Sequence, residues 1–279
     1  MKVFHTSQSL VEHLSKETRP IGMVPTMGAL HLGHLSLIER ALSENQTVLV
    51  SIFINPTQFD DKADLENYPI NIVTDLKKIE QLPGRIFVYT PKVKDVYGNL
   101  VTSKSIDLGG LDQVMEGKKR SGHFQGVATV VAHFLKVFTP NHAYFGEKDF
   151  QQLRIIEHIT QSLKLNTEII GCPIIREKDG LAMSSRNDFL SSDQRKLASK
   201  LFKGLKFAKS NAKKESYNTL KKMVMDFFEK YDELNLDYFT IAHPKTLKEV
   251  DLKEPVDLGR GFIAAHLGKI RLIDNLDMS

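Results

Sequence analysis

The chain has a single cysteine, no long hydrophobic run and little excess charge. Cys172 on its own excludes an intrachain disulfide, fits a reducing compartment and is expected to be a buried small residue rather than a nucleophile. The longest apolar run, Val48 to Ile54, is too short to cross a bilayer, and residues 1–17 are too polar for a signal peptide. A net charge of +4 argues against a dedicated nucleic-acid scaffold and suits a small anionic substrate. We therefore expect a cytoplasmic protein with neither a membrane nor a nucleic-acid partner.

An apolar content of 41% and a charged content of 26% are typical of a soluble globular protein. Strand-like and helix-like segments alternate through the first two thirds of the chain, and Val48 to Ile54 reads as a strand covered on both faces. This rhythm predicts an α/β fold with a doubly wound parallel sheet. The expected strands are 21–24, 48–54, 85–89, 143–145 and 167–175. One expected helix begins at residue 34, one lies within 65–82 after Pro69, and two cover 127–138 and 149–163.

The pattern changes after residue 175. A loop over 176–186 leads to Ser191 and Gln194, which have capping-box spacing. Lysine-rich helices are expected over 193–211 and 217–231, followed by strands at 236–242, 261–267 and 269–273. We therefore expect domains at 1–175 and 176–279, the second a smaller α+β domain. The polar segment 98–126 reads as an excursion from the core, and its cluster 118–120 is either solvated or a phosphate contact.

The most informative segment is Pro25-Thr26-Met27-Gly28-Ala29-Leu30-His31-Leu32-Gly33-His34. It follows an expected strand and leads into an amphipathic helix, so free N–H groups and the positive end of the helix dipole face the turn. Two imidazoles there can donate hydrogen bonds to phosphate oxygens. The pattern suggests a nucleoside triphosphate held for attack at its α-phosphate. The alternative is a strand–helix corner with two surface histidines.

Two further segments follow expected strands at the edge where parallel sheets bind ligands. Asn55 and Gln58 offer neutral amides after the strand that ends at Ile54. Gly146 permits close backbone approach, and Lys148 is a compact charge suited to phosphate. The alternative for each segment is an ordinary turn.

A last segment, 180–187, contains Met183, Ser184, Ser185 and Arg186 in a loop between the expected domains. Two hydroxyls before an arginine can stabilise charge as pyrophosphate departs. The alternative is a helix-capping serine pair, although Ser191 and Ser192 already have that place.

Taken together, these segments make the chain resemble the pantothenate synthetase (pantoate–β-alanine ligase) family over nearly its whole length. The matching signatures are PTMGALHLGH at 25–34, SIFINPTQF at 51–59, HFQGVATVV at 123–131, FGEKDFQQL at 145–153, DGLAMSSRN at 179–187 and RLIDN at 271–275. The family belongs to the nucleotidyltransferases with a His-x-Gly-His motif. The resemblance implies a Rossmann-like nucleotide- and pantoate-binding domain at 1–175 and a lid domain at 176–279.

The resemblance also implies an activity. Pantoate attacks the α-phosphate of ATP to give pantoyl adenylate and pyrophosphate, and β-alanine then releases pantothenate and AMP. The implied catalytic residues are His31, His34, Lys148 and Arg186. The implied ATP-binding residues are Pro25, Met27, His31, His34, Gly146, Lys148, Asp149, Ile175, Met183, Ser184, Ser185 and Arg186. The implied pantoate and β-alanine residues are Asn55, Gln58 and Gln152.

The resemblance further implies a homodimer and Mg²⁺ on the ATP phosphates. No carboxylate cluster in the sequence specifies a metal site built by the protein itself. Two positions depart from the family pattern: Ile70 stands where arginine is common, and Leu32 where an acidic residue is frequent. Two alternatives remain open. The first is an aminoacyl-tRNA synthetase or another nucleotidyltransferase; a synthetase should add a basic tRNA-binding domain, for which the chain shows no room. The second is a non-catalytic nucleotide sensor, which would not need both phosphate-contacting histidines and a separate amide-lined acid site.

Overall fold

A computed structural model describes residues 1–250 and 259–279. Their contacts divide them into two compact units, a first unit of residues 1–147 and 151–173 and a second unit of residues 148–150 and 174–279. Residues 148–150 and 174–175, which we expected in the first domain, group with the second unit. None of the described helices combines the length and the apolar character needed to span a bilayer.

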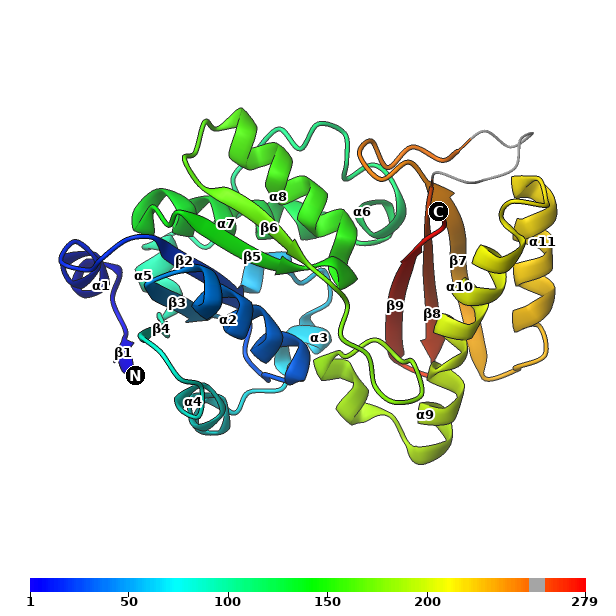
Figure 1. Cartoon of the computed structure of the whole chain (residues 1–279), viewed down its shortest axis with the longest axis horizontal. Helices are drawn as coiled ribbons and strands as arrows, with labels where there is room; N and C mark the ends of the chain where they lie inside the picture. Colours follow the sequence, from blue (N-terminus) through cyan, green and yellow to red (C-terminus); the bar gives the residue numbers. More distant parts are fainter. Residues whose placement is uncertain (251–258) are drawn as a thin grey trace. The chain divides into compact units, whose positions relative to one another are not determined.

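The first unit contains a sheet of six described parallel strands in the order β1-β4-β3-β2-β5-β6 (Figure 1). The strands are β1 (Lys2–Phe4), β2 (Ile21–Thr26), β3 (Thr47–Ile52), β4 (Ile86–Tyr89), β5 (His142–Gly146) and β6 (Glu168–Cys172). All six residues of β3 are buried, as a strand covered on both faces requires. The predicted doubly wound parallel sheet is therefore confirmed.

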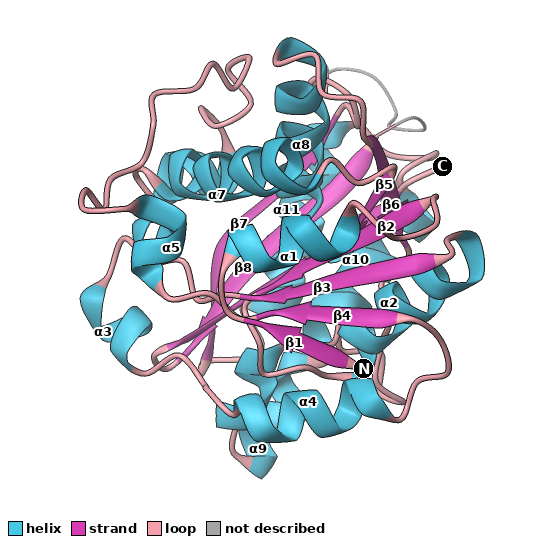
Figure 2. Cartoon of the chain, turned by 90° about the vertical axis from the view of Figure 1, so that its left-hand side faces the viewer, coloured by secondary structure: helices cyan, strands magenta, loops and turns pink. Residues whose placement is uncertain are grey.

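Helices cover both faces of this sheet. The views in Figures 1 and 2 place α7 (His123–Phe138) and α8 (Phe150–Ser162) on one face and α2 (Leu32–Glu44) and α4 (Ile72–Glu80) on the other. The remaining helices are α1 (Ser7–Leu14), α3 (Lys62–Glu66), α5 (Val93–Tyr97) and α6 (Met115–Lys119), with 3₁₀ turns η1 (Pro56–Gln58) and η2 (Glu147–Asp149). The chain leaves β2 and β5 in opposite directions across the sheet, so their carboxyl ends flank the topological switch point.

Several predicted boundaries were wrong in detail. The helix expected after Pro69 is α4, which is shorter than predicted, and the short helix α3 before that proline was not predicted. The expected helix over 193–211 is also two, α9 (Ser192–Ala198) and α10 (Lys200–Asn211), which meet at Ser199. The segment 98–126 contains α6 and the start of α7, so it is less of an excursion than its polar composition suggested.

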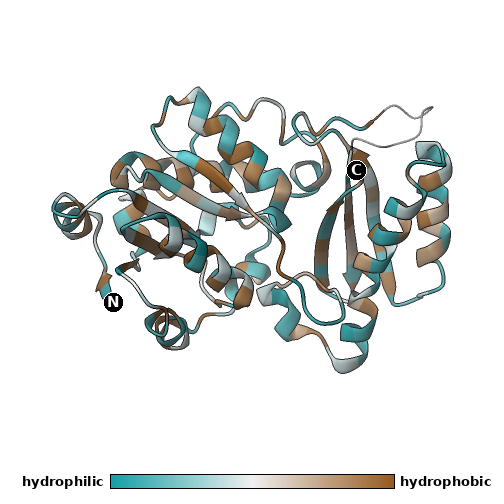
Figure 3. Cartoon of the chain, viewed as in Figure 1, coloured by the Kyte–Doolittle hydropathy of each residue, from teal (hydrophilic) through white to brown (hydrophobic). Residues whose placement is uncertain are grey.

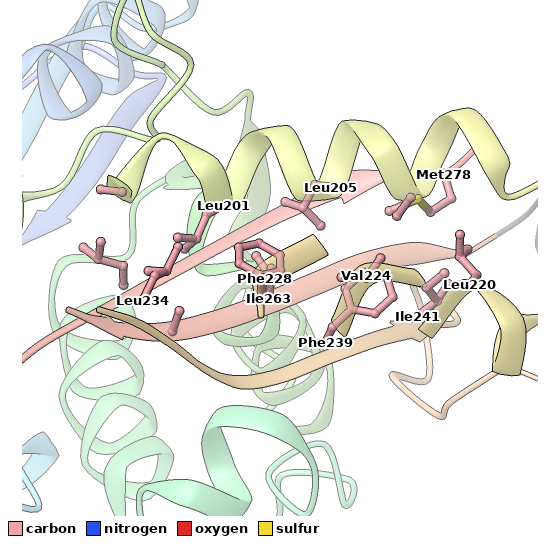
Figure 4. Close-up of a cluster of buried hydrophobic side chains, with 14 of the residues drawn as sticks. Leu201, Leu205, Leu220, Val224, Phe228, Leu234, Phe239, Ile241, Ile263 and Met278 are labelled. Carbon is pink, nitrogen blue, oxygen red and sulfur yellow. The ribbon is translucent and has the colours of Figure 1, made fainter. Parts of the chain in front are cut away.

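The second unit packs helices on an antiparallel sheet. The described strands have the order β7-β8-β9 and are β7 (Leu234–Ala242), β8 (Arg260–Leu267) and β9 (Ile270–Asp277). Leu201 and Leu205 of α10 and Val224 and Phe228 of α11 (Tyr217–Phe228) pack onto the strands (Figure 4). Both helices alternate hydrophobic and hydrophilic colour along their length in Figure 3, as amphipathic helices do. The predicted smaller α+β architecture is thus present in this unit.

The predicted capping box at Ser191 is confirmed. The Ser191 hydroxyl accepts a hydrogen bond from the Gln194 backbone N–H at 3.2 Å, and the Gln194 side chain accepts one from the Ser191 N–H at 3.0 Å. A third 3₁₀ segment, η3 (Ser185–Phe189), precedes it. Cys172 is buried, with 3% of its surface exposed, as we expected.

Candidate active site

The turn after β2 is held by hydrogen bonds of the Thr26 hydroxyl and has two residues with positive φ angles. The Thr26 hydroxyl donates to the Ser51 carbonyl at 2.8 Å and accepts from the Gly28 N–H at 3.2 Å. Gly28 has φ +87° and Ala29 has φ +49°, so two successive residues take left-handed conformations. This reversal delivers the chain directly into α2 at the carboxyl end of β2, beside the switch point.

The two histidines of the turn cap the helix that follows. His31 is the N-cap of α2, and its Nδ1 accepts from the Gly33 N–H at 3.1 Å. The Nδ1 of His34 accepts from the His31 N–H at 3.4 Å, and the two ring centroids are 4.1 Å apart. Since both Nδ1 atoms accept, the neutral tautomer that satisfies these bonds carries its proton on Nε2. The structure thus brings the predicted pair together as Nε2–H donors.

The prediction that the helix opens at His34 was wrong, because α2 begins at Leu32. The usual cap residues are Ser, Thr, Asp and Asn. Here a His–His capping box takes their place, which a search for the usual residues does not find.

After the end of β3, Gln58 contacts Met27, and Asn55 contacts Gln58. The Gln58 amide donates to the Met27 sulfur at 2.9 Å, and the Asn55 amide donates to Gln58 Oε1 at 3.1 Å and to the Gly126 carbonyl at 3.0 Å. Asn55 Oδ1 also accepts from the hydroxyls of Thr57, at 3.1 Å, and Tyr97. Asn55 is only 1% exposed, and protein groups engage both ends of its amide. Its geometry is that of a side chain that orients Gln58, rather than one that presents an amide to a ligand.

A buried histidine outside the predicted set supports the same segment. His123 Nδ1 lies 2.6 Å from the Gln58 carbonyl oxygen, and its Nε2 lies 3.2 Å from Arg120 Nη1. With Nδ1–H donating and Nε2 accepting, neutral His123 satisfies both bonds. Burial, reinforced by the charge of Arg120, lowers the pKa of His123 to about 4.

Arg120 also donates to Asp60 at 3.3 Å, so within the cluster 118–120 this residue has protein partners, which neither of our two expectations included. Lys118 and Lys119 are exposed. His123 is the first residue of the HFQGVATVV signature. The sequence analysis used that signature for the resemblance but assigned no function to its histidine.

Gly146 and Gln152 lie on either side of the turn after β5. Gly146 is the last residue of β5, opposite Cys172 of β6. Gln152 is half-buried on α8, whereas its neighbour Gln151 is buried and donates to the carbonyls of Leu111 and Val114 at 2.8 and 2.9 Å. The two adjacent glutamines therefore have different environments, and Gln151 serves to anchor the segment that leads into α6.

Lys148 and Asp149 group with the second unit. Lys148 Nζ is 3.3 Å from the Asp149 carboxylate, and its carbonyl accepts from the Asn275 amide at 2.9 Å. The neighbouring Phe150 packs against Phe262, with ring centroids 5.9 Å apart. This turn is thus built onto β8 and β9.

Ile175 and Met183 lie together in the second unit. The Met183 N–H donates to the Ile175 carbonyl at 3.0 Å, which closes a hairpin-like loop. Arg176 ties this loop to β9 through a two-pronged pair with Asp274, at 2.6 and 2.9 Å. Burial raises the pKa of Asp274, and Arg176 opposes that effect.

Ser184, Ser185 and Arg186 follow this loop. Ser184 is the N-cap of η3, its hydroxyl accepting from the Arg186 N–H at 3.3 Å, while Ser185 is buried. Ser184 therefore has the capping role that we had set aside for this serine pair. We had set it aside because the sequence did not predict η3, the element that Ser184 caps.

Comparisons with known proteins place the whole chain. The family model described as pantoate-beta-alanine ligase matches residues 2–277. A pantothenate synthetase of Christiangramia forsetii is 46% identical over 100% of both chains, and one of Flavobacterium psychrophilum is 45% identical over 94% of this chain and 93% of that protein.

Solved structures agree. A pantothenate synthetase from Thermus thermophilus has a TM-score of 0.93 at 38% identity, covering 100% of this chain and 99% of that one. A Francisella tularensis pantoate-beta-alanine ligase, complexed with "Beta-gamma ATP" and β-alanine, has a TM-score of 0.80 at 33% identity, covering 100% and 98%. The chain belongs to the pantoate-beta-alanine ligase family.

Proposed function

We propose that this chain condenses pantoate with β-alanine at the expense of ATP, giving pantothenate, AMP and pyrophosphate. The observation that carries the proposal is the family match across residues 2–277. In the first half-reaction a pantoate carboxylate oxygen attacks the α-phosphorus of ATP and pyrophosphate leaves. In the second, the amine of β-alanine attacks the acyl carbon of pantoyl adenylate and AMP leaves.

The phosphate-binding groups of the first unit are the two histidines. Their capping geometry supports the Nε2–H tautomer, which is the form that donates to phosphate oxygens as charge builds on them. Pro25, Met27 and Gly146 line the ATP site beside them. The residues of the second unit that we assign to ATP are Lys148, Asp149, Ile175, Met183, Ser184, Ser185 and Arg186, with Lys148 and Arg186 stabilising the departing pyrophosphate.

Gln58 and Gln152 hold pantoate, and Gln58 also faces β-alanine. A neutral amide can bind the hydroxyls of pantoate without competing with the phosphates for its carboxylate. Asn55 acts through Gln58, because its amide donates to Gln58 Oε1 at 3.1 Å. We propose this role for Asn55 in place of the direct substrate contact that we expected from its position after a strand.

Mg²⁺ enters with ATP as part of the substrate. Among residues 1–250 and 259–279, no three His, Cys, Asp or Glu side chains are grouped as metal ligands. Mg²⁺ commonly keeps several waters and is bound chiefly through substrate phosphates. We propose further that the first unit forms the nucleotide- and pantoate-binding domain, that the second unit, which includes residues 148–150 and 174–175, forms a lid, and that the protein is a cytoplasmic homodimer. Sedimentation at micromolar concentration tests the dimer, and a purely monomeric species would contradict it.

The test of function is ATP turnover against a panel of small acids and amines. AMP and pyrophosphate should appear with pantoate, and pantothenate only after β-alanine is added. Turnover with an amino acid and tRNA but none with pantoate would favour the synthetase alternative. ATP binding without turnover on any acid would favour a nucleotide sensor.

A further inference from the structure

Two side chains of helix α4 form hydrogen bonds with the backbone of the turn that carries the histidine pair. Asp75, in the first turn of α4, is buried, with 2% of its surface exposed. One carboxylate oxygen accepts from the Leu30 N–H at 2.8 Å and the other from the Ala29 N–H at 2.9 Å. Both oxygens of a buried charge are thus used on two consecutive amides, 46 and 45 residues away in the chain.

A second side chain of α4 binds the same turn. Lys78, one helical turn after Asp75, donates from Nζ to the Leu30 carbonyl. The N–H of Leu30 is therefore bound by Asp75, and its carbonyl is bound by Lys78. On the opposite side Thr26 attaches the turn to β3 through the Ser51 carbonyl.

The turn needs such support because of its backbone. Ala29 has φ +49°, a left-handed conformation that residues with a Cβ seldom adopt and that persists where the surroundings enforce it. A Cβ added at Gly28 would lie 3.0 Å from Asp75 Oδ2, so the carboxylate also closely approaches that glycine. His31, the N-cap of α2, comes two residues after Ala29, and its backbone direction follows from this turn.

Asp75 also occupies two of the backbone donors of this turn. Backbone amides before a helix commonly bind phosphate. Here the amides of Ala29 and Leu30 donate to the Asp75 carboxylate, so these two groups are not among the donors that the turn can offer to an anion. A carboxylate close to a phosphate site is electrostatically unfavourable unless it is held by donors, and two charge-assisted N–H bonds supply that hold.

We propose that Asp75, with Lys78, is a positioning residue for adenylate formation: it fixes the turn that sets His31 and His34 in their capping geometry. The inference rests on the proposed function above. Asp75 touches no reacting atom and acts through the backbone of residues 29 and 30.

The experiment compares Asp75→Asn with a matched control, Asp95→Asn. Asp95 also accepts a backbone N–H from a distant segment, that of Ser7 at 2.9 Å, but it lies on α5. An asparagine at 75 keeps one acceptor and turns an NH₂ group toward the second amide. We expect Asp75→Asn to slow pyrophosphate release from ATP and pantoate on the order of 10- to 100-fold, the ratio that one lost charge-assisted bond corresponds to.

The rate from supplied pantoyl adenylate and β-alanine should stay close to that of wild type in Asp75→Asn, and Asp95→Asn should leave both rates unchanged. The imidazole ¹⁵N spectrum should show the Nε2–H tautomer for His31 and His34 in wild type and a changed signature in Asp75→Asn. If Asp75→Asn does not fold, Lys78→Met carries the same test with a smaller effect in the same direction.

Equal slowing of both half-reactions, an unchanged pyrophosphate rate, or the same loss in Asp95→Asn would overturn the proposal. A wild-type protein that releases no pyrophosphate with pantoate would instead defeat the proposed function. In that event the imidazole spectrum alone decides the role of Asp75, because it does not depend on turnover.

Discussion

His34 and Gln58 have different roles in the proposed reaction: His34 binds the ATP phosphates, and Gln58 binds pantoate and β-alanine. Replacing His34 by alanine removes a donor whose bond strengthens as charge moves onto the phosphates, so we expect adenylate formation to slow by about 10²- to 10³-fold. Supplied pantoyl adenylate bypasses that step and should restore most of the rate. Gln58→Ala should instead raise the KM values for pantoate and β-alanine, and supplied adenylate should not rescue it.

Rapid-quench measurement of both half-reactions separates the two variants. The same response of both variants to pantoyl adenylate would contradict the division into a phosphate half and an acid half. Lys148→Ala provides a comparison within the phosphate half, because it removes a charge rather than an imidazole.

His123 should make the stability of the protein depend on pH. Its pKa is about 4 in the folded chain, against an ordinary value near 6.5, so the unfolded chain binds the proton first as pH falls. The stability contributed by neutral His123 is complete above about pH 6.5 and is lost as pH falls toward 4, by about 3 kcal/mol. Urea unfolding at intervals from pH 7 to pH 4 measures this slope.

The control variant is His123→Asn, which retains a donor to the Gln58 carbonyl but does not titrate. It should flatten the slope between pH 6.5 and pH 4, whereas His5→Asn, at an exposed site, should keep the slope of the wild type. A His123→Asn protein with an unchanged slope would mean that other groups carry the pH dependence.

At the scale of elements, α7 lies against the backbone of η1. A Cβ at Gly126 would be 2.3 Å from the Thr57 carbonyl oxygen and 2.6 Å from the Gln58 nitrogen. Gly126→Ala must therefore displace the segment that carries Gln58. We expect a higher KM for pantoate and a less stable fold, measured by steady-state kinetics and urea unfolding.

Gly204→Ala is the matched control, because it also places a methyl group on a helical glycine, here 2.5 Å from the Phe228 ring. It should lower stability while leaving the KM for pantoate near that of wild type. Equal KM changes in both variants would show that the effect is general destabilisation rather than displacement of η1.

The elements differ in how well the sequence predicted them. Strand β3 was predictable because burial on both faces leaves a run of apolar residues, and the cap of α9 was predictable because Ser191 and Gln194 are the usual capping residues. The short strand β1 and helix α1 were not predicted at all. In the case of β1, three residues carry too little periodicity to be recognised.

The supporting residues of the candidate site were beyond reach for a different reason. Asp75 and His123 bind backbone groups 45 and 65 residues away, and no local pattern records such a partner. The residues that would touch substrate were accessible because they lie in motifs at the ends of strands. Sequence thus indicated the groups for the chemistry, and the structure adds those that hold them.

At the scale of the whole molecule, each unit has its own hydrophobic cluster. Leu205 belongs to the cluster of the second unit and Val50 to one of the first, and both are fully buried. Leu205→Ala should cost about 2–5 kcal/mol. We expect hydrogen exchange to accelerate in β7, β8 and α11, while β2 and β3 retain their protection.

Val50→Ala should produce the opposite map, with exchange accelerating in β2 and β3. Mass-spectrometric exchange on both variants measures the two patterns. Uniform acceleration over the chain in either variant would mean that the two units unfold as one cooperative body.

The second unit draws three of its residues, 148–150, from the middle of the other's sequence. No single cut in the gene therefore separates the units. A polypeptide starting at residue 174 would lack the carbonyl that Asn275 binds at 2.9 Å and the ring over which Arg260 lies at 4.0 Å. The same holds for a chimera: exchanging 174–279 between two family members transplants β8 and β9 but leaves behind the tripeptide they bind. Relatives that differ at 148–150, 260 or 275 should recombine poorly at this boundary unless the tripeptide travels with the second unit.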